Sequence, residues 1–423
     1  MTTLNLADEF RGVAKKDGLG EENLYMPVYK TGIDAIDYHN GRVEGEENEK
    51  IVVGVEGGKI LTVIGPSGSG KSTAAIQIGT HIADQFEHAT VTHFDFERAT
   101  NIARIKGLTG WSDEKIKNKY HLMNRKIYSE SVYKMCKSIA NIKNKKENFD
   151  LLKYDTGIID YNGDKVYGIP PSIVIVDSWA VMVPQNIAEE EKLSGSMSAS
   201  AIAKENNSII KRLAGPLEEG NIILIIVNHI TEKIEIGPVK TKAKLNYLKQ
   251  NESIPGGSSC IYMASSLLRL EPGKKLEEDE TLGVKGFMSV GEFLKSRSNE
   301  SGKKFDMVFS QRNGLDNLMT NFNILKDNGY LKGSPRAYYF EDCPDVKFTQ
   351  KKFREKYNES VELQETIARL VDEVMVQFVP LPEKMGSEGE LELVECVDEE
   401  NDVWLGSDGN YYTGEGEEVE YEG

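Results

Sequence analysis

The chain has 423 residues, a mass of 47.2 kDa and a formal charge of −17. This length allows two or three compact units and excludes a small scaffold, while the negative charge argues against a protein that simply coats nucleic acid. The charge is uneven, because residues 381–423 carry −14 and the first 380 residues carry only −3.

The four cysteines, Cys136, Cys260, Cys343 and Cys396, lie far apart and form no C-x-x-C pair. Their spacing argues against a zinc ribbon or a dense disulfide framework and fits a reducing cytoplasm. No basic region precedes an apolar run at the N-terminus, and no stretch of 18 apolar residues occurs. We therefore expect a cytoplasmic protein that is not exported and has no membrane partner.

Residues 4–16 predict a short amphipathic helix that must dock on its own core or on a neighbouring subunit. We expect residues 1–48 to form an N-terminal oligomerisation extension. From Val52 onward, apolar strands alternate with glycine loops and helices, which is typical of a mostly parallel sheet flanked by helices. The expected buried strands are residues 60–64, 90–96, 172–176 and 221–227, within an α/β core that spans residues 49–311.

Several other elements are expected around these strands. The spacing of apolar residues predicts a helix over 132–142, and residues 154–167 predict a hairpin that turns at Asn162-Gly163. The long polar segment 231–257 predicts a mobile functional loop. Strands are expected near residues 286–294 and 305–309, and helices over residues 314–326 and 363–376.

The last two helices are assigned to a small C-terminal α/β unit, residues 312–380. Residues 381–423 are expected to be a largely disordered acidic tail. The segments Val403-Trp404 and Tyr411-Tyr412 contain aromatic residues that are unusual for a solvated tail and suggest a local docking element.

One motif points to nucleotide chemistry. Residues 65–72 match G-x-x-x-x-G-K-[ST] in full, after a predicted strand and before a predicted helix. The glycines let backbone N–H groups surround phosphate oxygens, and the helix N-terminus adds its positive end. Lys71 is expected to reach the β- and γ-phosphates and Ser72 to ligate Mg²⁺. The motif predicts a P-loop NTPase that binds ATP through Gly65, Pro66, Ser67, Gly68, Ser69, Gly70, Lys71, Ser72 and Thr73.

Two acidic residues complete this expectation. Asp177 follows a buried apolar strand and is a candidate for the Mg²⁺ shell, although acidic residues also end many purely structural strands. Glu97 follows another strand and is a candidate base for the attacking water. It could equally be a solvated strand-end carboxylate or part of a helix cap.

These sites in this order, followed by Val227-Asn228-His229 at the end of the next strand, resemble the RecA family of recombinases, most closely the bacteriophage UvsX-type members. The resemblance covers about residues 30–330 and includes the segments 211–217, 256–259 and 295–297. The acidic C-terminal tail is also typical of the family. The resemblance implies a RecA-like core.

The resemblance also implies roles for individual residues. Glu97 is similar to the catalytic glutamate, and His229 to the residue that senses the γ-phosphate, although a single histidine at a strand end is often structural. Lys295 and Arg297 resemble the basic pair that reaches the ATP of a neighbouring subunit, and otherwise are exposed strand charges. Arg104 stands where the family often stacks a tyrosine on adenine, a role that a planar guanidinium can fill.

Two DNA-binding loops are implied, at about residues 184–200 and 231–257. The second has a net charge of +2 and suits contact with the phosphate backbone. The first contains Glu189, Glu190 and Glu191, which departs from a DNA-binding pattern. The candidate DNA-binding residues are Met197, Lys233, Lys240, Lys242, Lys244, Lys249, Gly256 and Gly257.

The function that we expect is an ATP-dependent DNA recombinase that forms helical filaments on single-stranded DNA and exchanges strands with double-stranded DNA. Its implied partners are DNA, further copies of the chain, and single-stranded DNA-binding and mediator proteins. Two alternatives remain open. One is a ring-forming RecA-like motor, such as a replicative helicase or a DNA-packaging ATPase, and the other is a RecA-like regulatory ATPase or small-molecule kinase.

The acidic tail generates a first prediction. Deletion of residues 383–423 should tighten DNA binding, mainly at low salt, because the tail competes with DNA phosphates for basic loops. Fluorescence anisotropy with labelled single-stranded DNA over a salt series measures this change. Unchanged affinity and salt dependence would instead indicate a solubilising or partner-docking tail.

Overall fold

The computed structural model describes residues 27–44, 50–159, 165–189, 195–232, 247–276, 284–380, 393–398, 403–406 and 411–413. The chain divides into two compact units, residues 1–380 and 381–423. The predicted helix over residues 4–16 lies outside the described residues.

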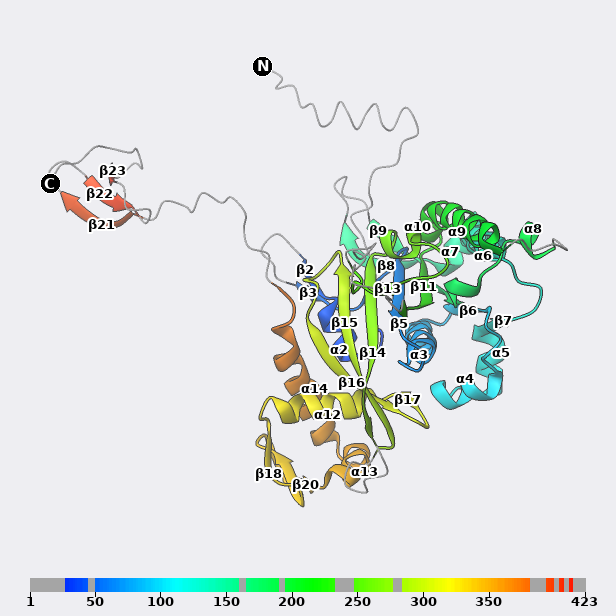
Figure 1. Ribbon diagram of the computed structural model, residues 1–423. Helices are drawn as coiled ribbons and strands as arrows, with labels where there is room; N and C mark the ends of the chain where they lie inside the picture. Colours follow the sequence, from blue (N-terminus) through cyan, green and yellow to red (C-terminus); the bar gives the residue numbers. More distant parts are fainter. Residues whose placement is uncertain are drawn as a thin grey trace, which may run out of the picture. The chain divides into compact units, whose positions relative to one another are not determined.

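A nine-stranded sheet forms the centre of the first unit (Figure 1). Six neighbouring strands are parallel, and three antiparallel strands extend the sheet at one side. In sheet order the strands are β17 (Gly314–Leu315), β16 (Lys304–Ser310), β15 (Gly286–Ser296), β14 (Ser266–Leu276), β5 (Ile60–Gly65), β11 (Ile222–His229), β10 (Ser172–Asp177), β6 (Thr90–Asp95) and β7 (Tyr120–Met123). The predicted mixed α/β fold with a large, mostly parallel sheet is confirmed.

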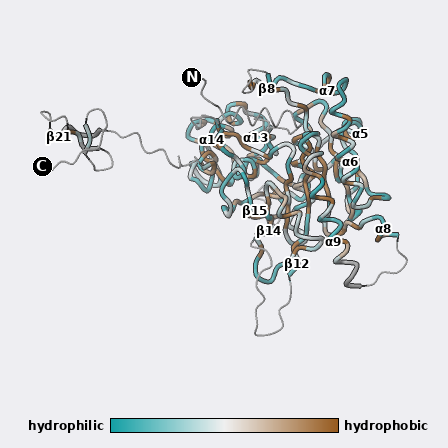
Figure 2. Tube along the Cα trace, turned by 90° about the horizontal axis from the view of Figure 1, so that it is seen from above, coloured by the Kyte–Doolittle hydropathy of each residue, from teal (hydrophilic) through white to brown (hydrophobic). Residues whose placement is uncertain are grey.

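The central strands are apolar throughout because both faces of the sheet are covered. Successive side chains of a strand point to opposite faces. Ile173, Ile175 and Ile225 accordingly belong to one apolar cluster, and Val174 and Leu224 to another. The brown segments of Figure 2 show these apolar residues gathered inside the first unit.

Helices build the two layers that cover the sheet. The first cluster includes residues of α2 (Asp34–His39), α3 (Lys71–Asp84), α4 (Ile102–Thr109) and α5 (Asp113–Lys119). The second includes residues of α6 (Ser129–Lys143), α9 (Gly195–Lys211), α10 (Ala214–Glu219) and α11 (Ser259–Tyr262). The shorter helical segments nearby are α7 (Lys146–Leu152), η1 (Trp179–Val181) and α8 (Gln185–Ala188).

Residues from both ends of the first unit share the first apolar cluster. Ile36 of α2 belongs to it together with Phe322 of α12 and Leu370 of α14, and α2 contacts both helices. Tyr38 also donates a hydrogen bond to Asp372. The C-terminal elements are α12 (Asn317–Asp327), β18 (Leu331–Ser334), β19 (Ala337–Phe340), β20 (Cys343–Phe348), η2 (Gln350–Lys352), α13 (Phe353–Glu359) and α14 (Val361–Val376).

Among the described residues, four two-stranded sheets lie outside the central sheet, all antiparallel. One confirms the predicted hairpin, because β8 pairs with β9 across residues 160–164, which lie outside the described residues and contain the predicted turn. The pairs are β1 (Val28–Tyr29) with β4 (Val55–Glu56), β2 (Arg42–Glu44) with β3 (Lys50–Val52), β8 (Tyr154–Ile159) with β9 (Lys165–Gly168), and β12 (Thr231–Glu232) with β13 (Glu252–Ser253).

The second unit corrects the expectation of a disordered tail for its described residues. Three strands, β21 (Leu393–Asp398), β22 (Val403–Gly406) and β23 (Tyr411–Thr413), form an antiparallel sheet. Trp404 is opposite Tyr412 in its register, so the unusual aromatic residues are a cross-strand pair. Aromatic cross-strand pairs stabilise antiparallel sheets.

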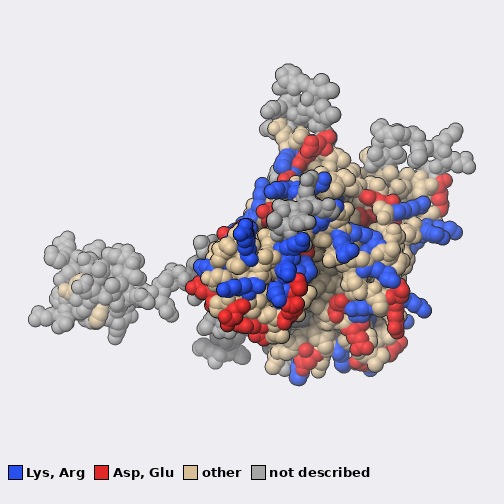
Figure 3. All heavy atoms as spheres, turned by 90° about the horizontal axis from the view of Figure 1, so that it is seen from below, with Lys and Arg blue, Asp and Glu red and all other residues tan. Residues whose placement is uncertain are grey.

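The surface of the first unit mixes both signs of charge. Figure 3 shows Lys and Arg side chains interspersed with Asp and Glu on the face seen from below. This mixture agrees with the nearly balanced charge of the first 380 residues. Among the described residues, no helix is long and apolar enough to cross a bilayer.

Candidate nucleotide-binding site

The predicted phosphate loop connects β5 to α3, as the motif requires. Gly70 precedes α3 with a φ of 93°, a left-handed conformation that favours glycine. A Cβ at this position would also stand 2.5 Å from the Phe309 ring. Gly70 therefore lets the chain turn into the helix while β16 packs directly against the loop.

The register of the parallel strands brings the predicted site residues to one edge of the sheet. His229 at the end of β11 is opposite Gly65, and Asp177 at the end of β10 is opposite Asp95. Glu97 follows Asp95 by two residues, and the amide of Phe96 donates a hydrogen bond to the Asp177 carbonyl at 2.7 Å. The carboxyl ends of parallel strands are where open α/β sheets bind ligands.

Asp177 and Ser72 form a pair that fits a magnesium ion. The Ser72 side chain hydrogen-bonds to Asp177, whose Oδ1 atom is buried and has no hydrogen-bond partner in the described part of the chain. Burial raises the pKa of Asp177 to about 6, so a bound cation would offset the cost of its charge. No group of three or more His, Cys, Asp or Glu residues with metal-binding geometry occurs among the described residues. A magnesium ion here would complete its shell with phosphate oxygens and water, as is usual for this metal.

Lys71 lies next to this pair. Its ammonium donates a hydrogen bond to the Pro66 carbonyl at 2.7 Å inside the phosphate loop. Burial lowers the pKa of Lys71 to about 8, while Asp177 and Glu97 act in the opposite direction. A phosphate group in the loop would stabilise the charged form of this lysine.

Glu97 and His229 are in direct contact, with 2.7 Å between Nε2 of the histidine and Oε1 of the glutamate. Burial raises the pKa of Glu97, but the nearby Ser178 hydroxyl, the hydrogen bond with His229 and the charge of Lys71 outweigh it, and the net pKa lies below the ordinary value. The carboxylate is therefore ionised at neutral pH, and Nε2 of His229 donates the hydrogen bond. The pair offers an oriented base beside the phosphate loop.

These residues open into a cavity of about 910 Å³. Arg104 also lines it, and its guanidinium reaches the Thr73 hydroxyl at 3.4 Å. The cavity brings together most of the predicted nucleotide-binding residues: Ser67, Gly68, Gly70, Lys71, Ser72, Thr73, Glu97, Arg104 and His229. Gly65 ends β5, and Pro66 and Ser69 complete the loop.

Sequence reasoning missed the opposite wall of the cavity. This wall comes from β14, the start of β15, the end of β16, the turn that follows it and β17. It carries Lys275, Leu276, Lys285, Gly286, Phe287, Phe309, Ser310, Gln311 and Gly314. The Ser289 hydroxyl donates a hydrogen bond to the Ser69 carbonyl at 3.3 Å, which ties β15 to the loop. These residues lie about 200 positions after the motif, and no local pattern marks them.

The candidate DNA-binding residues are only partly described. Lys233, Lys240, Lys242 and Lys244 lie outside the described residues, as does the side chain of Met197 at the start of α9. Lys249 forms an ion pair with Glu271 at 2.8 Å. Gly256 and Gly257 both have positive φ angles, and the Gly256 carbonyl accepts a hydrogen bond from the Trp179 indole at 2.9 Å.

The base of the second loop is joined to the nucleotide site. The pair β12 and β13 closes this base directly after β11. The side-chain amide nitrogen of Asn228 donates a hydrogen bond to the Pro255 carbonyl at 3.1 Å. Asn228 precedes His229, so a movement of the histidine would be transmitted to residues that lead into and out of the loop.

Lys295 and Arg297 lie at the other end of the strands, level with the amino-terminal ends of β14 and β5. Ser266 is opposite both Leu61 of β5 and Ser296 of β15. Leu61 precedes Gly65 by four residues, a separation of about 13 Å at about 3.3 Å per residue. Neither cation lines the cavity. The two residues are thus separated from the nucleotide site of their own chain by the length of the central strands.

Part of the sequence is similar to that of known proteins. No family model matches the chain. Protein RecA of Thermotoga neapolitana is 23% identical over 325 residues, which cover 76% of this chain and 76% of that protein. Protein RecA of Aquifex aeolicus is 22% identical over 327 residues, with 76% of each chain covered. The sequence similarity supports a RecA-like recombinase.

Among solved structures, the RadB recombinase aligns with a TM-score of 0.37 and 17% sequence identity. The alignment covers 62% of this chain and 92% of the RadB chain.

Substitution of the candidate base generates a second prediction. Glu97→Gln should lower kcat for ATP hydrolysis by about 10² to 10⁴, the usual contribution of general base catalysis. ATP binding should persist, because the amide oxygen can still accept the hydrogen bond from His229. Phosphate release and binding of a fluorescent ATP analogue measure the two effects. Exposed Glu87→Gln is the matched control, and wild-type turnover by Glu97→Gln would contradict the assignment.

Proposed function

We propose that the chain is an ATP-dependent DNA recombinase, of the UvsX type that its motifs resemble. It assembles as a helical filament on single-stranded DNA and exchanges strands with a homologous duplex. ATP and Mg²⁺ are its cofactors, and the RecA-like sequence similarity supports this class. Single-stranded DNA-binding and mediator proteins are the further partners that we propose.

One observation carries the proposal. The nucleotide site lies at the carboxyl edge of the parallel strands, and the basic pair Lys295 and Arg297 lies at the other edge. Such a pair can reach a nucleotide only on another copy of the chain. A contact between opposite edges of two copies is heterologous, so it repeats from copy to copy and forms a filament or a ring.

Each residue of the site has a separate role in ATP hydrolysis. Lys71 and the loop amides would hold the phosphates, and Ser72 and Asp177 would hold Mg²⁺, which would supply positive charge beside the phosphate oxygens. Glu97 takes a proton from the attacking water and is oriented by Nε2 of His229. Lys295 and Arg297 of the next protomer stabilise the transition-state charge.

The same site would respond to the state of the nucleotide. His229 contacts Glu97, and its neighbour Asn228 contacts the base of the lysine-containing loop. Loss of the γ-phosphate changes the charge around this pair and so favours a different position of the loop. We propose that DNA is released in this way after hydrolysis.

A ring-forming RecA-like DNA motor remains the second candidate, because a heterologous contact closes into a ring when its rotation returns to the start. Negative-stain electron microscopy with single-stranded DNA, Mg²⁺ and a slowly hydrolysed ATP analogue separates the two. We expect continuous helical filaments. Closed rings would favour the motor, and no assembly would contradict both.

The basic pair generates a further prediction. Lys295→Ala should lower DNA-stimulated ATP turnover by about 10³, the lower range for loss of a cationic finger. An isolated Lys295→Ala protomer should still bind ATP, whereas Lys71→Ala should lose both ATP binding and ATP turnover. Turnover with and without DNA measures the effect, and exposed Lys304→Ala on the neighbouring strand is the control. Wild-type turnover by Lys295→Ala would exclude a role across protomers.

A further inference from the structure

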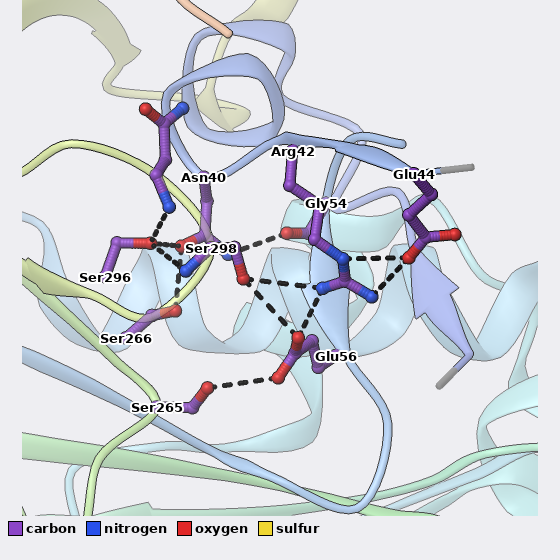
Figure 4. Close-up of polar contacts among 10 residues, drawn as sticks. Asn40, Arg42, Glu44, Gly54, Glu56, Ser265, Ser266, Ser296 and Ser298 are labelled. Carbon is purple, nitrogen blue, oxygen red and sulfur yellow. Dashed lines mark hydrogen bonds and ion pairs between the residues drawn. The ribbon is translucent and has the colours of Figure 1, made fainter. Parts of the chain in front are cut away.

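The segment that carries the basic pair is held by a dense set of polar contacts. Asn40 follows α2 and is buried, with 3% of its surface exposed. Its amide nitrogen donates a hydrogen bond to the Gly54 carbonyl at 2.7 Å. Its Oδ1 atom accepts hydrogen bonds from Ser266 at 2.8 Å and Ser296 at 3.0 Å (Figure 4). Asn40 thus connects the N-terminal segment to the start of β14 and the end of β15.

Ser296 stands between Lys295 and Arg297 and organises the turn that follows β15. Its hydroxyl donates to Asn40 and accepts from the backbone amides of Ser298 at 3.2 Å and Asn299 at 3.0 Å. A serine hydroxyl has one donor and two acceptor positions. All three positions are used here, so the hydroxyl defines the backbone of the turn and is itself fixed by Asn40.

Further contacts hold both sides of the turn. Ser298 lies between Arg42 and Glu56, which also form an ion pair with each other (Figure 4). The amide of Arg297 donates a hydrogen bond to the Ser265 carbonyl at 3.2 Å, and the ammonium of Lys295 donates one to the Tyr262 carbonyl at 2.8 Å. The Lys295 ammonium and the backbone of Arg297 are therefore held in place within a single protomer, before any neighbour is present.

We infer that Ser296, fixed by Asn40, is a positioning residue for Lys295 and Arg297. This inference rests on the proposed function, in which the two cations complete the nucleotide site of a neighbouring protomer. A turn that is ordered in advance places their charge without a further entropy cost on assembly. Ser296 is remote from the nucleotide site of its own chain. Its substitution should therefore lower ATP turnover at the neighbouring protomer and leave ATP binding by the substituted protomer intact.

Two serines that donate to the same atom give a matched pair of variants. Ser296→Ala should lower DNA-stimulated kcat about tenfold or more, because displacement of a catalytic group by about 1 Å can cost about 10²-fold. Ser266→Ala removes a hydrogen bond to the same Oδ1 atom but leaves the turn intact, so it should change kcat by less than about twofold. Ser296→Thr keeps the hydroxyl and should restore turnover.

The measurements separate positioning from simple loss of stability. Thermal melting should show similar folding of the two alanine variants, and a fluorescent ATP analogue should bind both as it binds the wild type. If Ser296→Ala does not fold, Ser296→Cys keeps the volume with a weaker hydrogen-bonding group and replaces it. Equal kcat values for the Ser296 and Ser266 variants would overturn the inference.

Mixed assemblies test the direction of the effect. Glu97→Gln keeps its cations and lacks the base, whereas Ser296→Ala keeps the base and has displaced cations. Mixing the two should restore turnover, because the intact pocket of a Ser296→Ala protomer then meets the intact cations of a Glu97→Gln protomer. Mixing Ser296→Ala with Lys295→Ala should restore little, because neither supplies an intact pair of cations.

A second mixture distinguishes failure of the inference from failure of the proposed function. Glu97→Gln mixed with Lys295→Ala should recover turnover if the cations act across protomers. No recovery in this mixture would contradict the proposed function itself. Recovery there, combined with wild-type behaviour of Ser296→Ala alone, would overturn only the positioning role of Ser296.

Discussion

The direction of the strands is the constraint on which the site depends. β5, β6, β10 and β11 are parallel, so their carboxyl ends meet at one edge of the sheet. The phosphate loop, Asp177, Glu97 and His229 follow these ends and are brought together although they lie far apart in the sequence. β15 is antiparallel to β14 and carries its own carboxyl end to the opposite edge. One sheet thus separates two groups of charged residues that belong to the same proposed reaction.

Burial at the carboxyl edge sets the electrostatics of the site. It raises the pKa of Asp177 to about 6 and lowers the pKa of Lys71 to about 8, so the charged forms of both groups are disfavoured. The site therefore holds charges at a cost that a nucleotide and its metal ion would offset. Glu97 differs, because the nearby Ser178 hydroxyl, the hydrogen bond with His229 and the charge of Lys71 keep its pKa below the ordinary value.

Local sequence patterns predicted the central strands and the phosphate loop because their signals are local. Continuous apolar runs define β10 and β11, and the glycine pattern after β5 requires a particular backbone. The wall formed by Phe287 and Phe309 depends on pairing over a long sequence separation, which no local pattern encodes. The pairing of Lys249 with Glu271 was missed for the same reason, and the roles of the site residues stay predictions.

Because the pocket and the cations lie at opposite ends of the strands, the two ends of any assembly built by the proposed contact differ. In a linear array of n protomers, the contacts number n − 1, and one terminal protomer has a pocket that no neighbour completes. The other terminal protomer presents cations that serve no pocket. Hydrolysis per protomer would then be lowest in short arrays and approach a constant value in long ones, so array length would act as a kinetic variable.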